Sequence, residues 1–272
     1  MFTKRFFNTV FATILFTWTS LSFAQTLEEV VVTAQIREQS LQDVPISVSA
    51  IAGEDIADRS VDNLQSLSAS VPNFMVVETQ IDTSISIRGV RSGANKGFEQ
   101  SVPMNFDGVT YPRSQLARTP LVDLERVEVL RGPQPTLFGK NAIGGAVSIT
   151  SAKPTEEFEG KFSTSHESEH GEDQSLLVLS GALSDNLLGR LTVSTREMDG
   201  WITNTNMKRV EPQRDETYIR GQLAWTSGDV DYNLKVETAD FDSVGYAMEA
   251  LAPQDGYGLV FAGPIAVETN ED

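Results

Sequence analysis

The sequence predicts an α+β domain followed by an antiparallel β-sheet of about five strands. Residues 44–154 mix short alternating strands with short amphipathic helices and with turns that contain Gly and Pro. After Pro154, segments of about ten residues alternate between apolar and polar side chains, which is typical of a sheet whose two faces meet different surroundings.

The composition excludes several classes of protein. The 272 residues contain 21 Lys and Arg against 38 Asp and Glu, which gives a formal net charge of −17. We expect no nucleic-acid partner, because phosphate contacts need clustered cations. The chain has no cysteine, so disulfides and thiolate metal sites are excluded.

A secretory signal peptide is predicted for residues 1–24. Lys4 and Arg5 precede a largely apolar run over residues 6–21, and Ser22 and Ala24 place small residues at a cleavage site. The run is short for a bilayer span, so we favour a cleaved signal over an uncleaved anchor. The mature chain then begins at Gln25.

Residues 25–43 predict an extended segment followed by a polar linker. Three valines and a threonine over residues 27–34 favour extended backbone. An accessible strand of this kind can pair with the edge of a partner's sheet through main-chain hydrogen bonds. The residues alone also fit an ordinary first strand.

The α+β domain is expected to contain three early strands and two short helices. Ser60 is the candidate N-cap of the second helix, whose apolar face carries Val61, Leu64 and Leu67. In chain order we expect a strand over 43–51, helices over 53–60 and 60–71, a strand over 84–89, a loop over 91–101 and a strand over 104–109 that turns at Asp107 and Gly108.

The most informative stretch covers residues 124–154, LERVEVLRGPQPTLFGKNAIGGAVSITSAKP. It reads as two strands joined by a turn region rich in Gly and Pro. The stretch resembles the end of the plug domain of TonB-dependent outer-membrane receptors, in which an RVEVLRGP strand precedes a GKNAxGG turn. Pro135 stands where that family usually has glycine, so we expect a local difference in the turn.

The resemblance extends the fold prediction to the whole chain. It implies a TonB box and linker over residues 25–43, a plug domain over 44–154 and the N-terminal part of an antiparallel transmembrane β-barrel over 155–272. The clearest strands are expected over 161–168, 175–183, 190–196, 218–225 and 230–237. Because receptors of this family need about 22 strands to enclose a plug, we expect the chain to be a fragment of a larger receptor.

The resemblance also assigns site residues. An exposed TonB box, which pairs with the energy transducer TonB, is implied for Glu28, Glu29, Val30, Val31, Val32, Thr33 and Ala34. Arg88 and Arg131 each end a strand, and the resemblance implies that they face carboxylates on the barrel wall and lock the plug. Substrate-facing plug loops are expected to present Lys96, Phe98, Tyr111 and Arg113, although solvated loop residues without a role fit equally well.

No enzyme motif is present in the sequence. His166 and His170 are four residues apart at the end of a predicted strand, and we expect solvated residues rather than a metal site. We expect no cofactor. The leading interpretation is a transporter in the cell outer membrane that takes up a scarce substrate such as an iron–siderophore complex, with TonB, lipid and a small molecule as partners. The alternatives are a soluble periplasmic plug-like module that binds TonB and a secreted adhesin-type β protein.

Overall fold

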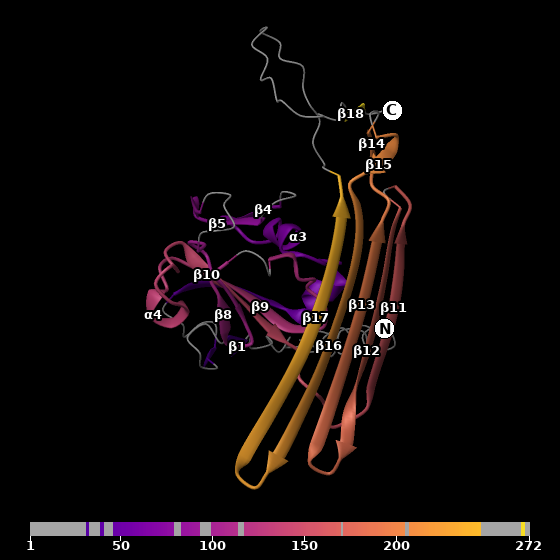
Figure 1. The fold of residues 1–272 in the computed structure, drawn as a ribbon. Helices are drawn as coiled ribbons and strands as arrows, with labels where there is room; N and C mark the ends of the chain where they lie inside the picture. Colours follow the sequence, from indigo (N-terminus) through magenta and orange to yellow (C-terminus); the bar gives the residue numbers. More distant parts are fainter. Residues whose placement is uncertain are drawn as a thin grey trace, which may run out of the picture.

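The molecule has two parts that lie side by side. The computed structural model describes residues 31–32, 39–40, 46–78, 83–92, 99–113, 117–169, 171–204, 207–245 and 268–269. An N-terminal α+β domain packs beside a C-terminal sheet of five long strands, and the sheet extends beyond the domain (Figure 1). This architecture confirms the fold class that the sequence predicts.

The N-terminal domain is built on a five-stranded mixed sheet in the order β3-β9-β10-β7-β8. Strands β10 and β7 are parallel and the other neighbours are antiparallel. The strands are β3 (Ser47–Ala52), β9 (Leu124–Arg131), β10 (Gly145–Ser151), β7 (Met104–Phe106) and β8 (Val109–Tyr111). Central β9 and β10 are the two strands that the sequence places in residues 124–154.

Gly145 shows why glycine begins β10. Its φ is +149°, and a Cβ atom there would lie 2.1 Å from the Leu130 carbonyl oxygen on β9. Only a residue without a side chain fits that approach. Gly145 therefore allows the close pairing of these two strands.

A second, three-stranded sheet and three short helices complete this domain. The sheet has the order β4-β5-β6, and its strands are β4 (Phe74–Glu78), β5 (Thr83–Ile87) and β6 (Val90–Arg91). The helices are α2 (Gly53–Asp58), α3 (Leu64–Ser68) and α4 (Pro135–Phe138).

The helices show where two residues singled out in the sequence lie. The N-cap of α3 is Asn63 and not Ser60, because the Asn63 side chain accepts a hydrogen bond from the Ser66 N–H at 2.8 Å. Ser60 instead has a φ of +52°. Pro135 is the first residue of α4, where the N–H that proline lacks would have no helical partner.

The domain has one main hydrophobic core between its sheets and helices. The core contains side chains from α2, α3 and both sheets, including Ile56, Leu64, Leu67, Ile87 and Val147. A smaller cluster around Leu130 and Phe138 lies on the other face of β9. The apolar stripe predicted for the second helix is therefore buried, as its spacing indicates.

The C-terminal sheet is antiparallel throughout, in the order β11-β12-β13-β16-β17. Its strands are β11 (Glu159–Glu167), β12 (Glu172–Ser184), β13 (Leu187–Met198), β16 (Gln213–Ser227) and β17 (Val230–Val244). Each predicted segment overlaps one of these strands, and the strands are longer than predicted. The connections β12–β13 and β16–β17 are two residues long, as the sequence indicates.

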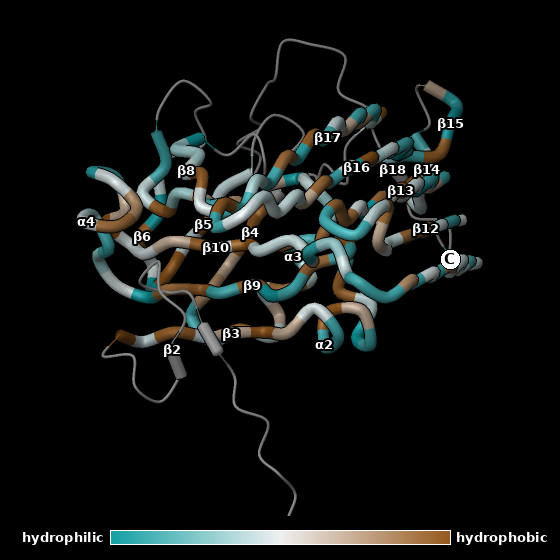
Figure 2. Tube along the Cα trace, turned by 90° about the horizontal axis from the view of Figure 1, so that it is seen from below, coloured by the Kyte–Doolittle hydropathy of each residue, from teal (hydrophilic) through white to brown (hydrophobic). Residues whose placement is uncertain are grey.

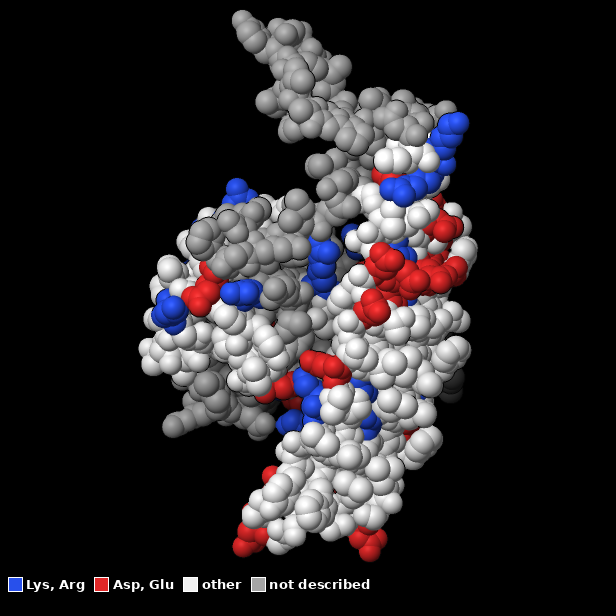
Figure 3. All heavy atoms as spheres, in the orientation of Figure 1, with Lys and Arg blue, Asp and Glu red and all other residues white. Residues whose placement is uncertain are grey.

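The two faces of this sheet differ in polarity. Along β16, outward Ile219 is 39% exposed whereas the next residue, inward Arg220, is 2% exposed. Register pairs Leu223 with Leu234 and Trp225 with Tyr232 on the outward face, where the two aromatic rings stack at 5.1 Å. The outward face is therefore an apolar surface, and Figure 3 shows few charges on the lower sheet except near the turns.

Five further short strands are described outside the three sheets above. The connection from β13 to β16 folds into β14 (Ile202–Asn204) and β15 (Arg209–Glu211), and β14 also pairs with β18 (Glu268–Thr269). Near the N-terminus, β1 (Val31–Val32) pairs with β2 (Gln39–Ser40). Among the described residues, no helix is both long enough and apolar enough to cross a membrane.

Candidate functional site

The candidate site is the interface between the N-terminal domain and the polar face of the C-terminal sheet. Figure 2 shows the strands of the sheet along one side of the domain when the molecule is viewed from below. Carboxylates of the domain meet cations of the sheet at three places, centred on Asp123, Asp62 and Asp107. Figure 3 shows blue and red atoms gathered between the two parts.

Asp123, directly before β9, is the most deeply buried of the three. Its carboxylate accepts hydrogen bonds from Arg190 Nε at 2.9 Å and from Arg190 Nη2 at 2.5 Å. Arg220 Nη2 reaches the same carboxylate at 3.2 Å and donates to the Asp123 carbonyl oxygen at 2.5 Å. Thr192 Oγ1 also donates to the carboxylate. We call these four side chains the Asp123 cluster.

The Asp123 cluster excludes water almost completely. The side chains of Asp123, Arg190 and Arg220 are 5%, 8% and 2% exposed. Burial opposes ionisation of Asp123, but the hydrogen bonds from Arg190 and Thr192 and the nearby positive charges outweigh burial and lower the pKa of Asp123. Two arginines around one carboxylate form strong, charge-assisted bonds.

Asp62, between α2 and α3, makes the second contact. Its Oδ2 lies 3.0 Å from Arg196 Nη1 and accepts a hydrogen bond from Gln174 Nε2 at 3.2 Å. Arg196 also pairs with Glu172 at 2.8 Å and lies 4.0 Å from Glu216. This contact joins the helical side of the domain to β12 and β13.

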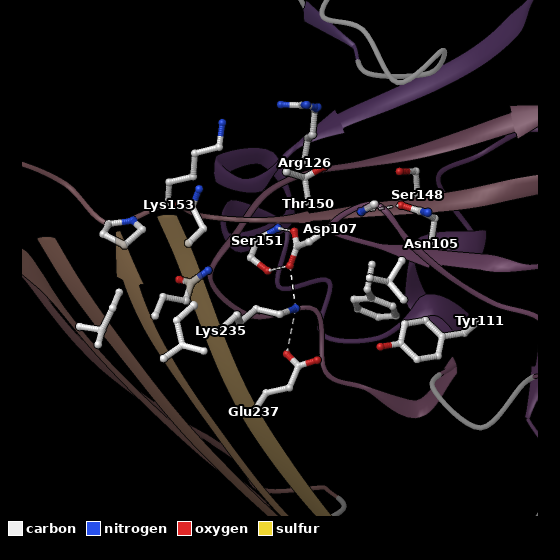
Figure 4. A pocket seen from close by; sticks show the side chains of 18 of the residues that line it. Asn105, Asp107, Tyr111, Arg126, Ser148, Thr150, Ser151, Lys153, Lys235 and Glu237 are labelled. Atoms are coloured by element: carbon white, nitrogen blue, oxygen red, sulfur yellow. Dashed lines mark hydrogen bonds and ion pairs between the residues drawn. The ribbon is translucent and has the colours of Figure 1, made fainter. Parts of the chain in front are cut away.

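Asp107, in the turn between β7 and β8, makes the third contact. Lys235 Nζ of β17 lies 2.7 Å from Asp107 Oδ2 and 3.3 Å from Glu237 (Figure 4). Ser151 donates to Asp107 through its N–H at 2.8 Å and its hydroxyl at 2.6 Å. Partial burial raises the pKa of Asp107, but the bonds from Lys235 and Ser151 outweigh it and leave that pKa lowered.

A cleft of about 920 Å³ lies beside the third contact. Its walls are the β7–β8 hairpin and the end of β10 on one side, and β16 and β17 on the other. Asp107 and the Tyr111 hydroxyl lie on the side of the cleft toward Lys235 and Glu237 (Figure 4), and apolar residues such as Phe106 and Phe138 also line it. The cleft therefore combines charged and hydroxyl groups with an apolar lining.

The predicted locking arginines make contacts inside the N-terminal domain. Arg131 Nη2 donates to Ser49 Oγ at 3.0 Å, and Arg131 Nη1 donates to the Pro72 carbonyl oxygen at 3.4 Å. Arg88 is exposed after β5, with a φ of +52°. Their role against carboxylates of a barrel wall stays a prediction. The contacts to the sheet have the opposite polarity, with carboxylates on the domain and cations on the sheet.

The other predicted site residues are only partly described. Val31 and Val32 form β1, while Glu28, Glu29, Val30, Thr33 and Ala34 lie outside the described residues, as do Lys96 and Phe98. Tyr111 is half-buried, contacts Phe106 edge-on and lines the cleft. Arg113 is exposed after β8.

The predicted histidine pair is described at one position. His166 is exposed, with Nδ1 2.8 Å from Asp173, and His170 lies outside the described residues. Within the described ranges, no group of three or more His, Cys, Asp or Glu side chains is placed to hold a metal ion.

The sequence does not predict the charged interface, although the alternation along β16 and β17 indicates part of it. Alternation places Arg220, Lys235 and Glu237 opposite the apolar face of their strands, so it predicts their inward direction. Asp123 gives no signal of its own, because its role depends on how β9 is positioned against β13 and β16.

Comparisons with known proteins identify the N-terminal domain. The TonB-dependent Receptor Plug Domain matches residues 40–146. The iron-regulated outer membrane virulence protein of Vibrio cholerae is 34% identical over 195 residues, which cover 65% of this chain and 29% of that protein. The vitamin B12 transporter BtuB of Vibrio vulnificus is 28% identical over 257 residues, which cover 91% of this chain and 39% of that protein.

A solved structure extends the likeness to the C-terminal sheet. The ferric yersiniabactin uptake receptor FyuA from Yersinia pestis superposes with a TM-score of 0.64 at 25% identity, over 71% of this chain and 31% of that one. The chain thus spans about a third of these relatives' length. The family consists of transporters and not enzymes, and the relatives are outer-membrane receptors. The N-terminal domain is thus a plug domain of the TonB-dependent receptor kind, and the five-stranded sheet that follows it shares the fold of an uptake receptor.

Proposed function

We propose that this chain supplies the plug and first wall strands of an outer-membrane receptor that actively takes up a scarce small molecule. One observation carries the proposal: the plug is held by buried ion pairs against the polar face of a sheet whose other face is apolar. A wall with lipid on one side and a plugged lumen on the other requires this division.

We propose a ferric siderophore as the substrate. The Vibrio cholerae relative is named as iron-regulated, and the Yersinia pestis relative is a receptor for the uptake of ferric yersiniabactin. Tyr111 and Arg113, with Lys96 and Phe98, are the proposed contacts on the plug loops. The vitamin B12 transporter among the relatives makes vitamin B12 the competing substrate.

Coupling to TonB is proposed for Glu28–Ala34. The extended backbone of Val31 and Val32 supports this proposal, because a strand is the form in which a peptide adds to a partner's sheet. In this mechanism, the external loops capture the substrate and TonB then pulls on the box to displace the plug.

Uptake in the source bacterium tests the proposal. We expect deletion of the gene to abolish accumulation of radiolabelled ferric siderophore, and deletion of tonB to have the same effect. Receptor-dependent accumulation of labelled vitamin B12, measured in parallel, would instead identify vitamin B12 as the substrate.

An immunoblot of cell fractions with an antibody to residues 44–152 locates the protein. A signal in the periplasm and absent from the outer membrane would favour a soluble TonB-binding module instead.

A further inference from the structure

The three charged contacts between plug and sheet differ in strength. The Asp123 cluster is almost fully buried and joins one carboxylate to two arginines. At the Asp107 contact, Lys235 and Asp107 remain 26% and 27% exposed. An ammonium group is a strongly hydrated point charge on a flexible stem, whereas a guanidinium binds a carboxylate through two directed bonds. The Asp107 contact is therefore easier to open.

The segment that carries Asp107 is also attached weakly to the rest of the plug. Strand β8 is at the edge of the sheet, and β7 pairs with β10 at only three positions. By contrast, β9, which follows Asp123, is central and pairs with both β3 and β10. Displacing the β7–β8 hairpin breaks fewer hydrogen bonds than moving β9.

The cleft lies on the weakly held side. The Lys235 side chain reaches from β17 across the cleft to Asp107 on the plug, and its ammonium group also contacts Glu237 on the same strand (Figure 4). Gln222 also lines the cleft, and its Oε1 is buried with no hydrogen-bond partner among the described residues. Buried polar atoms are normally paired, so this acceptor favours a polar, hydrogen-bonding occupant.

We propose that the cleft between the β7–β8 hairpin and strands β16 and β17 is the route by which a polar solute passes the plug, and that Lys235 and Asp107 form its latch. The contacts of Asp123 and Asp62, with β12, β13 and β16, hold the neighbouring part of the plug to the wall while the latch opens. This inference rests on the proposed transport function and adds the position of the opening.

Paired cysteines test the route in the full-length receptor, expressed from its own locus. The 272 residues contain no cysteine, so introduced pairs are the only thiols of this region. One variant carries Asp107→Cys and Lys235→Cys, and its matched control carries Asp62→Cys and Gln174→Cys, which also replace one plug and one wall residue in contact. Both are treated with the same short, reducible thiol crosslinker.

We expect crosslinking of the 107–235 pair to abolish TonB-dependent uptake and reduction to restore it, while the crosslinked 62–174 pair keeps transporting. Loss of uptake with both crosslinks means that the plug leaves the wall as a whole, and retention with both means that the solute passes elsewhere. Either result overturns the route. Absence of TonB-dependent uptake in the untreated wild-type receptor instead overturns the proposed function.

A single variant provides a second test that does not depend on crosslinking. We expect Lys235→Gln to raise the sensitivity of cells to polar antibiotics that the outer membrane excludes, because the latch is weakened. Asp185→Asn, in the exposed turn between β12 and β13, should leave that sensitivity unchanged. Equal sensitivity of both variants and the wild type, at equal receptor levels in the outer membrane, contradicts the latch.

Discussion

At the scale of single residues, Asp123 holds the plug against the wall. Replacing it by Asn leaves Arg190 and Arg220 buried without their counter-charge. Removing one partner of a buried ion pair costs about 3–5 kcal/mol, so we expect Asp123→Asn to lower the stability of the plug within the receptor by that order. Thermal unfolding of the purified receptor measures the change. Asp185→Asn, in the exposed β12–β13 turn, should leave the midpoint unchanged, and an equal shift in both variants would refute the role.

The same residue predicts an acid sensitivity. Asp123 faces Arg190 on β13 and Arg220 on β16, with Glu159 beside Arg190. Because the folded-state pKa of Asp123 is lowered, its stabilisation is fully present above the ordinary carboxylate value of 3.8 and is lost as pH falls through the folded-state value. We expect stability to fall below about pH 4 in the wild type. Unfolding midpoints measured against pH should fall less steeply in Asp123→Asn, and parallel profiles would contradict the assignment.

At the scale of elements, alternation predicted the strands well because it depends only on local sequence. Residues 218–225 and 230–237 lie within β16 and β17, with the predicted faces. The cap of α3 was wrong because both Ser60 and Asn63 are good caps, and the side-chain bond to Ser66 decides between them. The ion pairs between the plug and the sheet could not be predicted, because sequence periodicity does not say which strand lies against Asp123.

Adjacent residues of β17 separate the two faces of the wall. Leu234 is outward and 59% exposed, whereas Asn233 is on the inward, polar face of the same strand. We expect Leu234→Arg to destabilise the receptor in the membrane by about 2–4 kcal/mol, the effect of Arg on a lipid-facing position near the midplane. Asn233→Arg should be tolerated. The amount of heat-modifiable receptor in outer-membrane fractions measures both, and equal amounts of the two variants would exclude a lipid-facing role for this surface.

At the scale of the whole molecule, the resemblance predicted the plug and the strands after it, but it did not indicate the contacts that the structure shows between them. The resemblance implies a locking role for Arg88 and Arg131 because each ends a strand within a recognisable motif. The wall contacts instead use Asp123 and Asp107, which are ordinary turn residues in the sequence. Their importance comes from the packing of the plug against the sheet, which local motifs do not encode.

The N-terminal segment around Val31 carries the proposed coupling to TonB. Val31 pairs with Ser40 in the β1–β2 ladder, so its backbone already adopts the form that a partner strand needs. Proline removes the N–H that such pairing uses. We expect Val31→Pro to abolish TonB-dependent uptake, while Val31→Ala, which keeps the N–H, retains it. Substrate binding to whole cells at low temperature should be equal in both variants, because the loops that capture substrate lie far along the chain. Normal uptake by Val31→Pro would remove this segment from the coupling mechanism.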